Sequence, residues 1–177
     1  IMSLHVSDIV TAIERFAPLS LQEPYDNSGL QIGNLSAPVS AVLLCVDVTE
    51  EVIAEAKARQ CNMIVSHHPL LFKGLKHLTG TTPTERIAAA ALMENIAIYS
   101  AHTNIDNATH GTSWEMSHKL RLRDPKVLRP TEPNAVTGTG IIGWIEPMPT
   151  LEFLRHVKER FDVKALKYSV ESSQLVI

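Results

Sequence analysis

The feature that most constrains the fold is a pattern that occurs three times in the first 123 residues: an apolar, β-branched run and then an amphipathic helix. The three runs are VSAVLLCVDV (39–48), NMIVSHH (62–68) and IAIYSAH (96–102). Near-continuous apolar runs of this length are typical of strands that are covered on both faces. Strands that alternate with helices predict an α/β fold, with a parallel or mixed sheet and flanking helices.

Helical periodicity and start signals predict the remaining regular elements. Apolar residues recur at helical spacing in five segments: 7–18, 49–60, 82–95, 112–122 and 150–161. The predicted N-caps of the first four are Ser7, Thr49, Thr82 and Thr112. Pro83 at the first helical position and Glu85 three residues after Thr82 complete the signature of a helix start.

The domain organisation follows from these elements. Residues 1–123 form an α/β domain that carries the polar motifs described below, and residues 124–177 begin a second α/β portion. The proline-rich stretch 124–134 is interpreted as a subdomain boundary or a long connection, and VTGTGIIGWIEP (136–147) as a strand. Because the sequence stops within the strand-like run SSQLVI, we expect the second portion to be incomplete at its C-terminus.

Composition excludes several classes of protein. Apolar residues make up 45% and charged residues 20% of the 177, and no apolar run is long enough to predict a membrane span. The net charge of −3 and the absence of a Lys/Arg block disfavour nucleic-acid binding. Cys45 and Cys61 lie in or beside apolar strand patterns, so reduced thiols and a cytoplasmic location are expected.

Polar side chains collect where the predicted strands end. Asp47 ends the first strand, His67 and His68 end the second, and His102 ends the third, with Asp106 four residues later. The carboxyl ends of parallel strands form the binding crevice of such sheets. Imidazole and carboxylate groups gathered there predict a divalent-metal site. Adjacent histidines on a strand point to opposite faces, which suits two ions about 3.5 to 4 Å apart, one for each ring.

Some of these residues have more than one interpretation. His102 is either a metal ligand or a residue that orients a ligand or transfers a proton. Asp47 is either part of the site or a turn residue before Thr49. The stretch PYDNSGLQIGN (24–34) is either a plain loop or a source of hydrogen bonds near the mouth of the site. Phosphate-binding glycine loops and hydrolase serine elbows are absent, so metal-assisted chemistry is the leading mechanism.

Five motifs together resemble one known family. They are YDNSGLQIG, DVTEEVIAEA, VSHHPLLFKGLKHL, AIYSAHTNIDNA and GTGIIGWIEPMPTLEFLRHVKE. In order and over nearly the whole chain, they are similar to the Nif-three-like family, whose members are also called GTP cyclohydrolase 1 type 2 homologues. The resemblance implies two related α/β lobes in the complete fold.

The same resemblance implies a site and an assembly. It implies two divalent metal ions, with His67 as a ligand of one ion, and His68 and Asp106 as ligands of the other. A later histidine and a bridging glutamate of the family have no counterpart in this chain. It also implies a ring-shaped homohexamer. The ligand types fit zinc, iron, manganese or nickel.

Two functions are compatible with this sequence. The first is a metal-dependent hydrolase that acts on a nucleotide, in the manner of a GTP cyclohydrolase, with His102 as the candidate catalytic residue. The second is a non-catalytic metal-binding or regulatory protein that binds a protein partner. An open coordination position and a pocket large enough for a nucleotide would favour the first.

Overall fold

The computed structural model describes residues 4–169 and the backbone of residues 175–176. The chain divides into two compact units, Ile1–Ile105 and Asp106–Ile177. The predicted boundary was between residues 123 and 124. The structural division falls earlier because helix α5 (Thr112–Leu120) packs against strand β6 (Gly138–Trp144) of the second unit.

The first unit is built on a four-stranded sheet with the order β1-β4-β3-β2. Its strands are β1 (Gly29–Ile32), β2 (Val42–Cys45), β3 (Met63–Ser66) and β4 (Ala97–Ser100). Strands β2, β3 and β4 are parallel, and β1 pairs with β4 in the antiparallel sense. The sheet is therefore mixed, and the predicted α/β class is confirmed.

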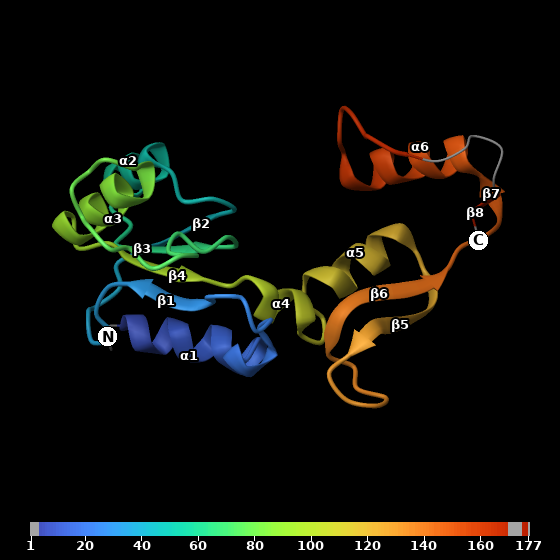
Figure 1. Cartoon of the computed structure of the whole chain (residues 1–177), viewed down its shortest axis with the longest axis horizontal. Helices are drawn as coiled ribbons and strands as arrows, with labels where there is room; N and C mark the ends of the chain where they lie inside the picture. The colour runs from blue at the N-terminus through green and yellow to red at the C-terminus, as the bar shows by residue number, and fades with distance from the viewer. Residues whose placement is uncertain (1–3, 170–174, 177) are drawn as a thin grey trace. The chain divides into compact units, whose positions relative to one another are not determined.

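Helices cover both faces of this sheet (Figure 1). They are α1 (Val6–Phe16), α2 (Glu50–Ala58) and α3 (Pro83–Met93). One core lies between the sheet and helices α2 and α3, where Ile64 and Ile98 are completely buried. The other lies beneath α1, where Met63 and Tyr99 are completely buried. Burial of apolar area in these two layers is the main force that holds the strand ends in place.

The helix starts were predicted with mixed success. The Thr49 and Thr82 side chains accept hydrogen bonds from the backbone N–H groups of Val52 and Glu85, as expected of N-caps. The prediction of Ser7 as the first N-cap was wrong, because the cap is His5, two residues earlier, and the Asp8 carboxylate accepts the His5 N–H. The prediction of Thr112 as an N-cap was also wrong, because Thr112 is the first helical residue and the cap is Gly111.

The second unit consists of a hairpin and two helices. Strands β5 (Arg123–Pro130) and β6 pair in the antiparallel sense, and helix α5 packs on β6. Helix α6 (Thr150–Phe161) contacts α5 and the short pair β7 (Met148–Pro149) and β8 (Leu175–Val176). The predicted connection at 124–134 was wrong, because most of it is β5.

Two short elements complete the chain: a 3-10 turn at Leu19–Leu21 and helix α4 (Thr103–Asn107), within which the two units divide. Of the predicted terminal run 172–177, residues 172–174 and 177 lie outside the described residues. None of the helices in the described part of the chain has the length and hydropathy needed to cross a membrane.

Candidate metal centre

The topology of the sheet brings the predicted site residues to one edge. Asp47 follows β2, His67 and His68 follow β3, and His102 follows β4, and these three strands are parallel neighbours. His67 and His68 donate their backbone N–H groups to the carbonyls of Cys45 and Val46, over 3.1 and 2.9 Å. The ladder between β2 and β3 thus continues through both histidines and fixes their backbone.

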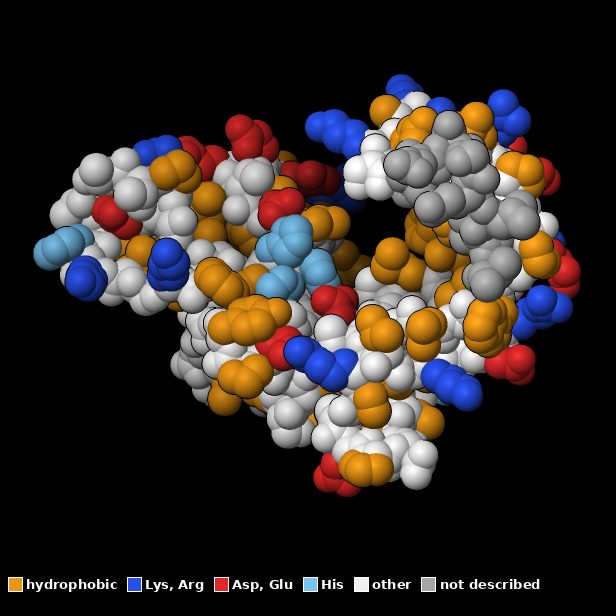
Figure 2. Space-filling view, turned by 45° about the vertical axis from the view of Figure 1, so that its right-hand side comes forward, with side chains coloured by type: hydrophobic (Ala, Val, Ile, Leu, Met, Phe, Trp, Pro, Cys, Tyr) orange, Lys and Arg blue, Asp and Glu red, His pale blue; other side chains and the backbone are white. Residues whose placement is uncertain are grey.

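The three imidazole rings form one cluster. The ring centroids of His67 and His68 lie 5.0 Å apart, and those of His102 lie 5.2 and 5.6 Å from them. One ring nitrogen of each histidine lies within 4.8 Å of the other two. Figure 2 shows histidine side chains gathered in one patch on the surface. The prediction that strand-end histidines meet is confirmed, whereas the expectation that His67 and His68 point to opposite faces does not hold.

The reason for this convergence lies in what each Nδ1 atom contacts. The Nδ1 of His67 lies 2.9 Å from the carbonyl oxygen of Ala101, just after β4. The Nδ1 of His68 lies 2.7 Å from the Asp47 carboxylate, just after β2. The two rings are therefore anchored to opposite neighbours of β3. Asp47 contacts the cluster through this bond, which favours the site interpretation over that of a plain turn residue, and its role in a metal site stays a prediction.

The third ring is anchored by a carboxylate from the N-terminal loop. The Nδ1 of His102 lies 2.8 Å from Asp26 Oδ1. The Asp26 side chain is fully buried, and that of His102 is 19% exposed. Phe72 packs its ring edge-on against His102, with centroids 6.4 Å apart. A buried carboxylate and an aromatic ring together leave His102 little rotational freedom.

Each of the three Nδ1 atoms thus faces a group that can only accept a hydrogen bond. A carbonyl oxygen or an ionised carboxylate has no proton to give, so each Nδ1 carries the hydrogen. In a neutral imidazole the lone pair is then on Nε2. Histidines that bind metals characteristically donate the other ring N–H to a carboxylate or carbonyl. The donor set therefore fits a divalent metal ion.

The ionisation state of Asp26 agrees with its role as an acceptor. Burial by itself raises the pKa of the Asp26 carboxyl, but the hydrogen bonds that it accepts outweigh this effect and hold the pKa well below its usual range. The donors are Thr103, His102, Ser28 and Asn27. Asp26 is consequently ionised at neutral pH, and His102 Nδ1 faces a full negative charge.

The loop 24–34 contributes further contacts near the site. Asn27 Nδ2 donates to the Leu71 carbonyl over 2.7 Å, and Gln31 Oε1 accepts the Leu71 N–H over 3.2 Å. These bonds attach the segment after His68 to the loop and to β1. The functional interpretation of this loop is therefore favoured. Ser28 and Thr103 were not foreseen, because a hydroxyl beside a buried carboxylate leaves no pattern in the sequence.

Asp106 lies in helix α4, four residues after His102, and is the first residue of the second unit. Its role as a metal ligand stays a prediction, as do the roles of the three histidines.

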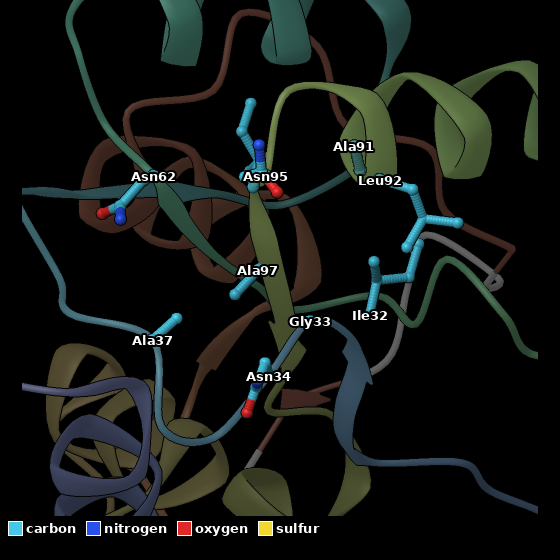
Figure 3. Close-up of a pocket in the computed structure, with 10 residues that line it drawn as sticks. Ile32, Gly33, Asn34, Ala37, Asn62, Ala91, Leu92, Asn95 and Ala97 are labelled. Carbon is cyan, nitrogen blue, oxygen red and sulfur yellow. The ribbon is translucent and has the colours of Figure 1, made fainter.

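Two pockets bear on the function. The first has a volume of about 660 Å³, and Asp47, His68, Glu50 and Glu51 are among the residues that line it. A pocket of this size is within the range of about 300 to 1,000 Å³ that is usual for small-molecule sites. The second, of about 220 Å³, lies at the opposite ends of β3 and β4 (Figure 3). None of its ten lining residues is acidic, histidine or cysteine, so it is not a second metal site.

Comparison with known proteins identifies the class to which this fold and site belong. The model of the Duf34/NIF3 (NGG1p interacting factor 3) family matches residues 4–177, and the chain belongs to this family. A Clostridium acetobutylicum relative named GTP cyclohydrolase 1 type 2 homolog is 38% identical over 170 residues, which is 94% of this chain and 63% of that protein. The chain therefore spans less than two thirds of the length of this relative.

Solved structures show the same fold. A Bacillus cereus protein related to NIF3 has a TM-score of 0.90 at 24% identity, over 99% of this chain and 75% of that one. Reduced HcgD from Methanocaldococcus jannaschii has a TM-score of 0.77 at 29% identity, over 90% of this chain and 61% of that one. The family resemblance that the sequence motifs suggested is thereby confirmed.

Proposed function

We propose that this chain binds divalent metal through His67, His68 and His102, and that the centre supports the hydrolysis of a nucleotide or a related compound. The observation that carries the proposal is the orientation of the three imidazoles. The Nδ1 of each lies against a fixed acceptor, which favours the neutral tautomer with hydrogen on Nδ1, the form in which Nε2 is the nitrogen that coordinates a metal. A divalent cation held there supplies Lewis acidity, which favours attack of water on a polarised substrate.

The finer parts of the proposal come from the family. The dinuclear arrangement adds Asp106 as a ligand of the second ion, and the names of relatives such as the C. acetobutylicum protein suggest purine-nucleotide hydrolysis. The ring-shaped homohexamer is proposed on the same basis, and the cytoplasmic location on the expectation that Cys45 and Cys61 are reduced thiols. Metal identity follows supply as much as affinity for such ligands, so zinc, iron, manganese and nickel remain candidates.

The 660 Å³ pocket beside His68 supports the hydrolase over the purely regulatory protein, because small-molecule sites are usually pockets of about 300 to 1,000 Å³. The negative charge of the pocket limits the class of substrate that can bind there. Glu50, Glu51 and Asp47 line it, and one oxygen of Glu50 is occupied by an ion pair with Arg86 over 2.9 Å. Negative charge repels free phosphates, so we propose that a neutral purine ring, rather than a triphosphate, lies in this pocket.

The test is metal content by elemental analysis, followed by product analysis with GTP, guanosine and a panel of phosphoesters. About two ions per chain would support the dinuclear arrangement, and one ion would support the three-histidine site alone. His68→Ala should lose metal, whereas His77→Ala, an exposed histidine of the same unit outside the cluster, should retain it. Metal-free protein after loading would refute the proposal. Metal without turnover would favour the regulatory alternative, which the family name also suggests.

A further inference from the structure

The Asp26 carboxylate beside the cluster accepts several hydrogen bonds. Its Oδ1 accepts from His102 Nδ1 and from the backbone N–H of Asn27, over 2.8 and 2.7 Å. Its Oδ2 accepts from the Ser28 hydroxyl over 2.8 Å, and from both the N–H and the hydroxyl of Thr103. His102 and Asp26 are 76 residues apart in the sequence. The Asp26 side chain is fully buried, and an unpaired buried charge would be strongly destabilising. The five donors offset this cost.

We propose that Asp26 is the positioning residue of the centre: it keeps the hydrogen of His102 on Nδ1 and holds the ring so that Nε2 faces His67 and His68. Of the three roles predicted for His102, two need the lone pair on Nε2: binding a metal and accepting a proton. The consequence for metal affinity rests on the proposed function. The tautomer of His102 in the metal-free protein is independent of the proposed function, and it can be measured separately.

The surrounding structure supports a fixed rather than an adaptable contact. The Glu23 N–H donates to the Thr103 hydroxyl over 2.9 Å, so the loop before Asp26 is attached to the same turn that carries His102. The backbone of His102 is held as well, because its N–H donates to Asn104 Oδ1 over 2.9 Å. Ring and backbone of His102 are therefore positioned by independent bonds.

The pair of Asp47 with His68 provides a comparison within the same cluster. Its Nδ1–Oδ1 distance of 2.7 Å matches that of the buried pair. However, the side chains of His68 and Asp47 are 50% and 66% exposed. Water can replace an exposed acceptor, and exposed ion pairs contribute little. Replacing the carboxylate by an amide should therefore affect the histidine tautomer and the zinc affinity much less at Asp47 than at Asp26.

The substitution Asp26→Asn tests the role of the carboxylate at nearly constant shape. Each oxygen of Asp26 accepts a hydrogen bond from a backbone N–H, Oδ1 from Asn27 and Oδ2 from Thr103. A backbone N–H can only donate, so neither bond can change direction. An amide NH₂ placed on either side would face one of these donors. If it faces the Asn27 side, His102 must release Nδ1–H and protonate Nε2 instead, which removes the lone pair from the cluster.

The experiment measures tautomers and metal affinity in four proteins: wild type, Asp26→Asn, Asp47→Asn and Ser28→Ala. Ser28→Ala is the matched control, since it removes one donor to Asp26 without touching the carboxylate. Long-range ¹H–¹⁵N spectra of the metal-free proteins should show His102 with hydrogen on Nδ1 in the wild type and in Ser28→Ala. Asp26→Asn should shift His102 toward the Nε2–H form and lower the affinity for Zn²⁺ about 10- to 100-fold, measured by competition with a chelating dye.

The outcomes separate the two proposals. His102 with hydrogen on Nε2 in the metal-free wild type would overturn the inference, even if Asp26→Asn did not fold. Equal losses of zinc affinity in Asp26→Asn and Asp47→Asn, with His102 unchanged, would also overturn it. A third outcome is that His102 changes tautomer in Asp26→Asn, but none of the four proteins binds zinc. The positioning role of Asp26 would then stand, and the proposed metal function would fail.

Discussion

Two asparagines that each join a backbone carbonyl to a backbone N–H allow the cost of burying a polar group to be measured in this chain. Asn104 Nδ2 donates to the Ala17 carbonyl over 2.7 Å, and its Oδ1 accepts the His102 N–H. Asn62 Nδ2 donates to the Pro38 carbonyl over 2.7 Å, and its Oδ1 accepts the Ser40 N–H over 2.8 Å and the Ser40 hydroxyl over 3.0 Å. Each therefore joins one backbone carbonyl and one backbone N–H. Asn104 is completely buried, whereas Asn62 is partly exposed.

We expect Asn104→Ala to lower the free energy of unfolding by about 2 to 6 kcal/mol. A buried group left without a partner costs about 1 to 3 kcal/mol, and this substitution leaves two such groups. Asn62→Ala should cost about 1 kcal/mol or less, because water reaches the groups that it leaves.

Urea unfolding of both variants at pH 7, followed by circular dichroism, measures the difference. Parallel transitions with equal slopes are required, so that the change reflects stability rather than the extent of unfolding. If the two variants lose the same free energy, burial does not set the cost and the reasoning fails. Asn104→Ala should also weaken metal binding, because the backbone of His102 loses its anchor.

Three further predictions concern the rest of the first unit. The backbone N–H of Thr79, and then its hydroxyl, are the main causes that lower the pKa of Glu85 from 4.5 to about 2, so its contribution is present above pH 4.5 and is lost as the pH falls toward 2. Glu85→Gln should therefore destabilise the chain at pH 7, with a difference from wild type that shrinks in urea titrations between pH 5 and pH 2; a constant difference would contradict this. Gly33→Ala should cost about 1 to 3 kcal/mol in the same assay, because φ is +119° and the new Cβ would lie 2.7 Å from Ala97 Cβ, whereas Gly74→Ala, with nothing within 4 Å, should be near neutral. Zinc at 100 times its Kd should stabilise the wild type by about 2.7 kcal/mol in thermal unfolding and should not stabilise His68→Ala; equal shifts would exclude the cluster as the site.

The parts of the fold that the sequence predicted are those with strong periodicity. Strands β2, β3 and β4 have near-continuous apolar runs because helices cover both of their faces. Strand β5 was missed because Pro125 and Pro130 lie within it and proline cannot donate to a ladder. Among the described residues β5 pairs with β6 alone, so one of its edges needs no donors and tolerates proline.

Strand β1 was missed for a different reason. It is only four residues long and begins at Gly29, and Gly33 follows it, both with positive φ, in a stretch whose polar and glycine content is typical of a loop. Its place is set by pairing with β4, which is a tertiary contact that no local pattern records. Edge strands of this kind depend on their neighbour more than on their own propensity.

The same distinction between local pattern and tertiary contact explains the site. His67, His68 and His102 could be grouped from sequence because each follows a strand, and parallel strands end at one edge. What sequence could not provide is the partner of each Nδ1, since Ala101 and Asp26 reach their histidines only in the folded sheet. Identical residues with Nδ1 exposed to water would exchange between tautomers and bind metal more weakly. The chemistry of the centre therefore depends on the acceptors as much as on the histidines, and variants of Asp26 test it more directly than removal of a ligand.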